Sequence, residues 1–294
     1  MFYRRKILLS LIQVFGNELE KISLQKLLFL FMQHKQNPEY DFVPYKYGCF
    51  SFSANADLNA LCKKGLLEDL DSLYRITEDI DYLNVLKPLD KKRMFELKET
   101  YGMMSNNSLM KHTYINYPLW AIKSVVAKKI LDKKFYQRVV NAIPNNDKTI
   151  LYTIGYEGIS LEEYLIRLIK NDVKILVDVR RNPLSMKYGF SKTSLSKFCN
   201  ALDIEYVHFP EVGIESEDRQ ELNTQEDYNI LFEKYKQNNL TKTIDIQNKI
   251  LNLLIEKKRI ALTCFEADIC QCHRTHLAEA ISLNPIFSYE VKHI

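Results

Sequence analysis

The segment between residues 263 and 274 holds the densest group of reactive side chains in the sequence. It reads Thr-Cys-Phe-Glu-Ala-Asp-Ile-Cys-Gln-Cys-His-Arg, which combines thiols, carboxylates, an imidazole and a guanidinium. Such groups can bind a metal ion, supply a nucleophile or hold an anion. The residues that can carry this chemistry are Cys264, Glu266, Cys272, His273 and Arg274, and we treat Cys270 as an extra thiol outside the site.

Metal binding is the least favoured of these three roles. The pattern Cys-x5-Cys-x-Cys-His differs from the Cys-x2–4-Cys pairs of common zinc modules, and the adjacent Cys272 and His273 would be an awkward chelate. We therefore predict no metal ligand and no cofactor, and keep a metal or redox role of the thiols as a minor alternative. A nucleophile is compatible with the sequence, because a cysteine beside Arg274 at a helix start can have a lowered pKa.

Anion binding uses most of these residues with the fewest assumptions. A helix N-terminus offers N–H donors, and Arg274 together with Arg180 can add charge-assisted hydrogen bonds. Arg180 and Asp178 end a predicted strand and lie on the same side of it, so an ion pair between them is the alternative interpretation. Ser185 belongs to the loop that follows, whose Ser, Lys and Tyr residues suit a lid.

Two further strand ends carry candidate groups. Gly155 and Tyr156 follow the first predicted strand, and the glycine can let an anion approach backbone N–H groups. A plain tight turn is the stronger explanation for the glycines alone. His208 ends the third predicted strand; a lone histidine is more often structural than catalytic, but its place at the same edge favours a role in the site.

The elements that position these residues are predicted from residue 148 onward. Strands are expected at 149–154, 174–179, 204–209, 259–264 and 285–291, and helical segments at 160–171, 192–202, 226–257 and 273–283. This alternation is typical of an α/β fold with a mostly parallel, Rossmann-like sheet covered by helices on both faces. Ligands bind such sheets where the strands end, so we expect the candidate residues to meet at one edge.

The first half of the sequence is predicted to be mainly helical. Helices are expected at 3–15, from Ser23, at about 51–64, at 86–101 and at 109–122, with a short hairpin at 66–76. Helices followed by a β-ribbon is the order of a winged-helix domain. The third helix offers only Lys63 and Lys64 as basic groups against Asp57, so a protein-binding role is at least as well supported as DNA binding.

Charge and turn signals suggest how the chain is divided. Residues 1–150 carry 23 basic and 16 acidic residues, whereas residues 151–294 carry 18 and 21, so the first part is favoured for any contact with nucleic acid. Residues 141–147 have turn chemistry without a hydrophobic pattern, and a basic helix is expected before them at 128–140. We predict a helical, winged-helix-like regulatory or binding domain at 1–120, a helical linker at 121–147 and an α/β domain at 148–294.

The first part resembles the Panacea-type antitoxin domain and its relatives. The similarity lies in a Lys-Leu-Leu-rich helix, an aromatic turn and a helix that ends in Gly-Leu, here at Ser23–Leu30, Phe42–Ser51 and Leu58–Leu66. Cys49 replaces the usual proline of the turn. This resemblance covers roughly the first 120 residues and implies a regulatory or antitoxin-like module, with no catalytic residue to carry over.

The second half resembles the domain of unknown function 488 family. Four separated polar motifs, in the family's order, carry the similarity: Thr153–Gly158, Asp178–Ser185 with Phe190, Tyr206–His208 with Glu211 and Gly213, and Cys264–Glu266 with Cys272–Arg274. The resemblance implies a compact α/β domain with a cleft lined by the Gly-Tyr, Asp-Val-Arg and Cys-His-Arg segments. It implies no settled reaction. Val212 and Ile214 depart from the usual residues of that loop.

Composition argues against a membrane-spanning protein and against a secreted, disulfide-rich one. Hydrophobic residues make up 46% of the 294, the net charge is +4, and no window approaches the roughly 18 consecutive apolar residues of a membrane helix. The basic and apolar start of the chain lacks a small-residue cleavage site, and the six cysteines lack the density of a secreted disulfide framework. We therefore expect a cytoplasmic protein that does not span a membrane.

Two functions remain open at this point. The first is an enzyme that acts on a nucleotide or nucleic-acid-related phosphorylated substrate, with Asp178 or Glu266 as base, Tyr156 and His273 as proton donors or orienting groups, and Cys264 or Cys272 as nucleophile. The second is a non-catalytic, ligand-sensing regulator or antitoxin-like protein that binds DNA or a protein partner. In both, the predicted anion-binding residues are Gly155, Arg180, Ser185, His208 and Arg274.

Overall fold

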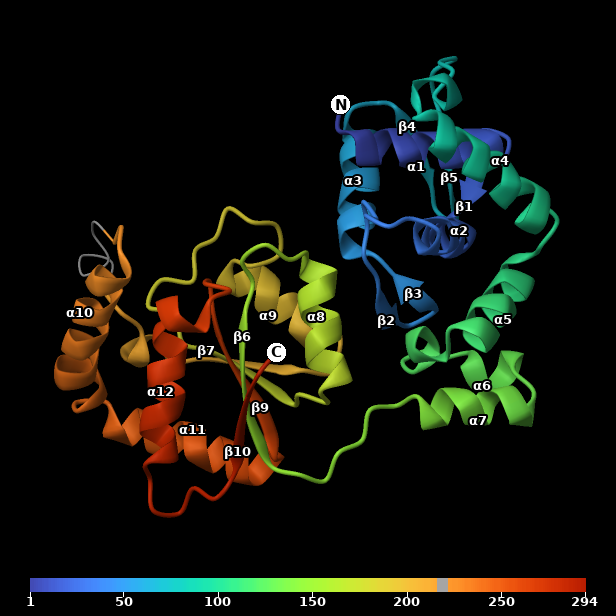
Figure 1. Cartoon of the computed structure of the whole chain (residues 1–294). Coiled ribbons are helices and arrows are strands. Elements are labelled where there is room, and N and C mark those ends of the chain that lie inside the picture. Colours follow the sequence, from blue (N-terminus) through green and yellow to red (C-terminus); the bar gives the residue numbers. More distant parts are fainter. Residues whose placement is uncertain (216–221) are drawn as a thin grey trace. The chain divides into compact units, whose positions relative to one another are not determined.

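A computed structural model describes residues 1–215 and 222–294 and divides the chain into two compact units (Figure 1). The first unit is Met1–Ile143 and the second is Pro144–Ile294. Residues 121–143, which the sequence led us to expect as a linker, therefore belong to the first unit. The expected three-part division itself stays a prediction.

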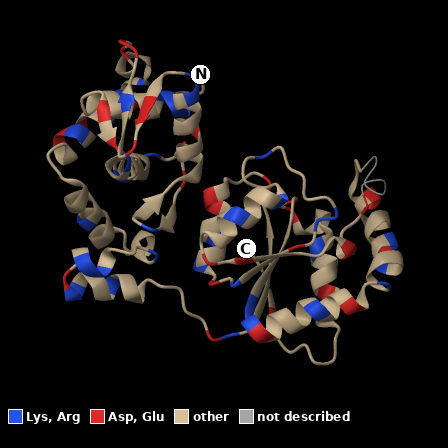
Figure 2. Cartoon of the chain, turned by 180° about the vertical axis from the view of Figure 1, so that it is seen from behind, with Lys and Arg blue, Asp and Glu red and all other residues tan. Residues whose placement is uncertain are grey.

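The first unit is mainly helical, as predicted. Its helices are α1 (Tyr3–Val14), α2 (Lys21–Gln33), α3 (Phe52–Lys63), α4 (Pro88–Tyr101), α5 (Asn106–Asn116), α6 (Ala127–Ile130) and α7 (Lys133–Asn141), with 3-10 turns η1 (Leu83–Val85) and η2 (Pro118–Ala121). One basic helix was expected at 128–140, but α6 and α7 are separate because Leu131 and Asp132 have extended backbone. Lys and Arg are concentrated in these two helices (Figure 2).

Short antiparallel strands complete the first unit. The predicted hairpin is confirmed as β4 (Leu67–Leu70) and β5 (Leu73–Ile76), and β1 (Glu18–Glu20) pairs with β5 on its other side. The strands β2 (Val43–Tyr45) and β3 (Gly48–Phe50) form a separate hairpin. The sequence did not predict β1, because three residues with one buried side chain are too few to show an alternating pattern.

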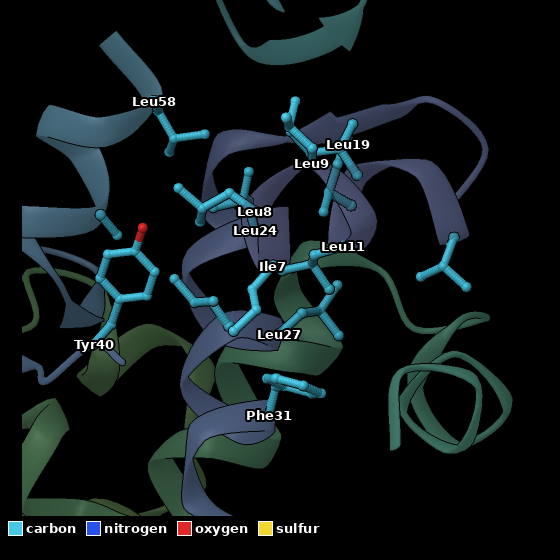
Figure 3. Close-up of a cluster of buried hydrophobic side chains, with 14 of the residues drawn as sticks. Ile7, Leu8, Leu9, Leu11, Leu19, Leu24, Leu27, Phe31, Tyr40 and Leu58 are labelled. Carbon is cyan, nitrogen blue, oxygen red and sulfur yellow. The ribbon is translucent and has the colours of Figure 1, made fainter. Parts of the chain in front are cut away.

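A large hydrophobic core joins α1, α2, α3 and α4 (Figure 3), and a second, smaller core joins α5, α6 and α7. α1 and α2 lie at the centre of the large core, since the side chains of Ile7, Leu8 and Leu11 and those of Leu24 and Leu27 are almost fully buried. Residues 7–12 of α1 and 23–32 of α2 are all buried, so along these stretches each helix is covered on all sides and not on one face alone. The expected winged-helix-like character of this unit stays a prediction.

The second unit contains a five-stranded sheet in the order β10-β6-β9-β7-β8. Its strands are β6 (Ile150–Gly155), β7 (Ile175–Asp178), β8 (Glu205–His208), β9 (Arg259–Cys264) and β10 (Glu290–His293), and all pairings are parallel. The predicted parallel α/β sheet is confirmed. The last strand lies later than the expected 285–291, because residues 284–287 form a turn before it.

Helices cover both faces of this sheet (Figure 1). α8 (Leu161–Lys170) and α9 (Lys192–Asn200) lie on one face, where the Tyr164 hydroxyl donates to Thr263 Oγ1 at 2.7 Å. α10 (Gln225–Tyr235), α11 (Ile244–Lys257) and α12 (His273–Ser282) pack on the other face with Val177 and Leu262. The single helical segment expected at 226–257 is two helices, joined by the π-helical turn Lys236–Leu240.

The central strands β6, β7 and β9 are buried along almost their whole length, because both of their faces are covered. None of the helices in the described ranges is long and apolar enough to cross a membrane.

Candidate functional site

The carboxyl ends of three neighbouring strands bring the candidate residues together. In the register of the sheet, Gly155 on β6 stands opposite Cys264 on β9, and Asp178 on β7 stands opposite Thr263 on β9 and His208 on β8. Residues that are far apart in the sequence therefore share one edge, as expected for a parallel sheet.

Gly155 allows the loop after β9 to cross the end of β6. A Cβ atom at this position would lie 2.0 Å from the backbone oxygen of Glu266, a separation that no side chain can occupy. The same crossing is held by backbone hydrogen bonds from Tyr156 and Glu157 to the oxygen of Phe265, at 3.1 and 3.0 Å. In this structure Gly155 thus permits a close backbone approach within the protein, a role that the sequence alone did not separate from anion binding.

Asp178 and Arg180 form a buried, two-pronged ion pair. Arg180 Nε donates to Asp178 Oδ1 at 2.8 Å and Nη2 donates to Oδ2 at 2.5 Å, and the Tyr206 hydroxyl donates to Oδ2 at 2.6 Å. Asp178 is fully buried and Arg180 is 6% exposed. Burial alone would lower the pKa of Arg180, but the hydrogen bonds and the charge of Asp178 raise it. The ion-pair alternative is therefore realised, and Asp178 serves to hold Arg180.

Tyr156 takes a further hydrogen bond from the same guanidinium. Arg180 Nη1 donates to the Tyr156 hydroxyl at 2.7 Å and to the oxygen of Phe190 at 2.9 Å, and the Tyr156 ring stacks on Phe190 with centroids 4.2 Å apart. Burial raises the pKa of Tyr156, and the charge of Arg180 and a hydrogen bond from Ser185 oppose that rise. Tyr156 therefore stays a neutral hydroxyl at physiological pH and orients Arg180.

His208 is held by two polar contacts beside this pair. Its Nε2 lies 2.9 Å from the oxygen of Arg180, and its Nδ1 lies 3.0 Å from Nζ of Lys192. The carbonyl can only accept, so Nε2 carries the proton and Nδ1 accepts from the lysine. This arrangement makes His208 a residue that positions the backbone of Arg180.

The four-residue group Cys264, Glu266, Cys272 and His273, here called the thiol cluster, brings its donor atoms within 4.8 Å of one another. The Cys264 thiol donates to Glu266 Oε2 at 3.0 Å and lies 3.5 Å from His273 Nδ1. His273 Nε2 lies 3.0 Å from the oxygen of Val179, so this nitrogen carries the proton and Nδ1 faces the thiol as an acceptor.

Cys272 lies at the residue before the first turn of α12 and is fully buried. Burial, followed by a hydrogen bond with Cys264, raises its pKa well above the ordinary value. Cys270, by contrast, is exposed on the 3-10 turn η6 (Ile269–Gln271). Cys270, which we treated as an extra thiol, is not a member of the thiol cluster.

Arg274 braces the loop that carries Glu266. Its Nη1 donates to the oxygen of Glu266 at 2.5 Å and its Nη2 donates to the oxygen of Ala267 at 3.4 Å. The side chain is 2% exposed, and its Nε finds no hydrogen-bond partner among the described residues. Arg274 therefore lies beside the thiol cluster, as expected, with most of its guanidinium directed at backbone carbonyls.

A cavity of about 370 Å³ opens at this edge of the sheet. It is lined by Tyr156, Arg180, Arg181, Asn182, Leu184, Ser185, Met186, Ile214, Cys264 and Phe265. The loop expected to act as a lid supplies Leu184, Ser185 and Met186 to this wall. Of the predicted residues, the cavity thus brings together Tyr156, Arg180, Ser185 and Cys264.

The sequence analysis did not single out Arg181, Asn182 or Phe265 as site residues. Arg181 and Phe265 stand next to residues that were selected, and Asn182 lies one residue further along the loop after β7. A larger cavity of about 430 Å³ lies in the first unit, between residues of α2 and α4. We take the smaller one as the candidate site, because the thiol cluster adjoins it.

Comparison with known families identifies only the second unit. Residues 160–281 match the family described as Domain of unknown function DUF488, which confirms the resemblance seen in the sequence. No curated protein and no solved structure matches the chain. The resemblance of the first unit to antitoxin domains stays a prediction.

Proposed function

Starting from the DUF488 domain that the chain contains in its second unit, we propose that this protein is an enzyme whose active site is the cavity at the carboxyl edge of the sheet. The proposed substrate is phosphorylated and of nucleotide or nucleic-acid type. One observation carries the proposal: the Cys264 thiol lines the cavity while a carboxylate and an imidazole lie within hydrogen-bond distance of it.

The thiol cluster supplies the groups that proton transfer requires. Glu266 accepts the hydrogen bond of the Cys264 thiol, and His273 Nδ1 is a second acceptor 3.5 Å from the same sulfur. Glu266 is the base in this proposal, since both carboxylate oxygens of the other candidate, Asp178, accept hydrogen bonds from Arg180 and Tyr206. The sulfur atoms then act either as a nucleophile or as ligands of a metal ion that activates water.

The wall of the cavity favours a nucleotide-like substrate. Phe265 is 42% exposed and offers a ring face on which a base can stack. Arg181 and Asn182 supply a guanidinium and an amide beside it, and guanidinium geometry matches phosphate oxygens. Arg181 forms an exposed ion pair with Glu215, at 2.7 Å, and donates to the oxygen of Pro210 at 3.3 Å, so a phosphate can compete with Glu215 for it. Arg180 then has a positioning role, because its N–H groups bond within the protein.

The test is a screen of full-length protein against nucleoside monophosphates, nucleoside triphosphates and short single-stranded DNA and RNA, with chromatography to detect products. We expect one class to be converted, and Glu266→Gln to lower the rate about 100-fold or more, as expected for loss of a general base. Arg181→Ala should raise KM with a smaller effect on kcat.

The matched control for this screen is Cys270→Ser, which removes an exposed thiol outside the cluster and should leave the rate unchanged. Turnover that survives Glu266→Gln at the normal rate would contradict the assigned chemistry. No conversion in any class would contradict the proposed enzyme.

A regulator without catalysis is the second candidate function. The observation that favours it is that Arg180 and Arg274, the two cations predicted to hold phosphate, donate to acceptors of the protein itself. The first unit would then transmit ligand binding to DNA or to a protein, with the basic helices α6 and α7 as the nucleic-acid contact (Figure 2).

This alternative predicts ligand-dependent binding with no turnover. A salt titration distinguishes its two forms, because binding to DNA phosphates weakens steeply with salt and an apolar protein interface does not. Replacing Lys128 and Lys129 by Ala should reduce the salt slope only if DNA is the partner.

A further inference from the structure

We propose that the thiol cluster is a zinc site in which Cys264, Glu266, Cys272 and His273 each supply one ligand. The four donor atoms already lie within 4.8 Å of one another, from two elements that the fold holds in place. Cys264 ends the central strand β9 and Glu266 follows it, whereas Cys272 caps α12 and His273 is its first residue. This proposal does not rest on the proposed enzymatic function.

The distances fit a tetrahedral zinc ion with small adjustments. With Zn–S of about 2.3 Å and Zn–N of about 2.0 Å, neighbouring sulfur and nitrogen ligands lie about 3.5 Å apart. The distance from Cys264 Sγ to His273 Nδ1 is 3.5 Å. Glu266 Oε2 is closer to the same sulfur, at 3.0 Å, and would move outward by about half an ångström to take its place in the tetrahedron.

The imidazole is prepared as a ligand by its second contact. Zinc-binding histidines usually donate their other ring N–H to a carbonyl or carboxylate, which fixes the tautomer and the ring orientation. His273 Nε2 makes this contact with the oxygen of Val179, at 3.0 Å, and both residues are fully buried. The lone pair of Nδ1 is consequently directed at the centre of the cluster.

The structure also answers the objection that neighbouring residues chelate poorly. Cys272 has extended backbone, with φ −131° and ψ 128°, whereas His273 is the first helical residue. The change of backbone direction between them lets both side chains reach the same point, although their separation in sequence is a single residue. Spacing rules derived from zinc modules do not cover a site built from a strand end and a helix start.

Ligand chemistry and charge select zinc among common metal ions. Thiolate and imidazole ligands favour zinc, whereas magnesium and calcium take oxygen ligands. Zinc binding would release the two thiol protons to solvent, leaving two thiolates and one carboxylate around a divalent ion. The resulting single negative charge lies beside the buried Arg274 guanidinium, which has an electrostatic interaction with Cys272.

If the cavity is also an active site, zinc determines which group reacts there. Cys264 becomes a ligand and is no longer available as a free nucleophile. Glu266 is the hardest of the four ligands and is less buried than the other three, so it is the one that water or a phosphate oxygen would replace. Only after this replacement is its carboxylate free to act as the proposed base.

The test is metal analysis of the full-length protein purified without chelator. We expect about one zinc ion per chain. After removal of metal with EDTA, titration with Co²⁺ should give a thiolate-to-cobalt charge-transfer band and the ligand-field bands of a tetrahedral site. A wild-type protein that gives neither zinc nor these bands would overturn the proposal, whatever its activity.

Variants then identify the ligands. Cys272→Ser removes a direct ligand and should weaken Zn²⁺ binding by more than about 100-fold. Loss of a group that only supports a ligand already weakens metal binding by up to about 100-fold. Cys270→Ser is the matched control from the same segment and should bind as the wild type does. Equal binding by both variants would overturn the assignment. If Cys272→Ser does not fold, Glu266→Gln is tested in its place. It should also bind Zn²⁺ more weakly, and an unchanged affinity would contradict the four-ligand site.

Discussion

Replacing Arg180 by methionine should destabilise the second unit far more than the same change at its neighbour Arg181. Arg180→Met keeps the length of the side chain and leaves the Asp178 carboxylate buried without its cation. Asp178 is fully buried and takes two side-chain hydrogen bonds from Arg180. Removal of one partner from such a pair costs about 3–5 kcal/mol. Arg181 and its partner Glu215 are both exposed, and a pair of that kind contributes at most about 1 kcal/mol.

The assay is urea unfolding of the full-length protein, followed by two signals. The chain has one tryptophan, Trp120 in the first unit, so its fluorescence reports that unit, whereas far-UV circular dichroism reports both. With an m value of about 2 kcal/mol/M, the expected loss lowers the midpoint of the second unit by about 2 M. The Trp120 midpoint should not move, because the two units have separate cores.

A second substitution separates the loss of the ion pair from the loss of packing. Asp178→Asn added to Arg180→Met removes the unpaired charge, so the double variant should regain part of the lost free energy of unfolding. The reasoning is refuted if Arg180→Met and Arg181→Met have equal effects. A double variant that is less stable than Arg180→Met would also refute it.

Two further outcomes follow from contacts elsewhere in the chain. Gly155→Ala would set a Cβ against the oxygen of Glu266, so the loop must shift and thermal unfolding should show a loss of about 2 kcal/mol or more; an unchanged melting temperature would count against the close approach. In the first unit, burial would raise the pKa of Asp90, but hydrogen bonds from Lys35 and Tyr3 outweigh it and hold the pKa below its ordinary 3.8. A carboxylate of this kind stabilises the fold above pH 3.8 and loses that contribution as pH falls through the folded-state pKa. Asp90→Asn should therefore lower the melting temperature at pH 7, measured by tryptophan fluorescence, by an amount that shrinks as pH falls below 3.8; a difference that stays constant with falling pH would contradict the electrostatic origin.

The sequence predicted the position of the site better than the bonding inside it. Runs of apolar residues located four of the five strands of the second unit within a residue or so, and the rule for parallel sheets then placed Gly155, Asp178 and Cys264 at one edge. Periodicity says which side of a strand a residue is on. It does not say whether the Arg180 side chain contacts a ligand or Asp178, since either contact places Arg180 on the same side of the strand.

Contacts between segments were the part that sequence reasoning could not supply. Cys264 and Cys272 are separated by a loop whose path depends on the absence of a side chain at Gly155. The proximity of His273 Nδ1 to Cys264 depends on its other nitrogen reaching the oxygen of Val179, which directly follows strand β7. The last strand, β10, was placed too early because the turn before it contains Pro285 and Phe287 among apolar residues that resemble a strand.

The strand order of the second unit has a consequence for how this protein is made. β6 and β7 do not pair with each other, because β9 lies between them, and β9 is completed only at residue 264. A chain that leaves the ribosome can therefore pair β7 with β8 early, but the middle of the sheet must wait until residues 259–264 have emerged. Such late closure by distant segments gives slow folding and a period in which strand edges are open to other chains. Chains truncated before residue 259 would keep the apolar strands β6 and β7 without the partner between them, and we expect them to aggregate or to be degraded.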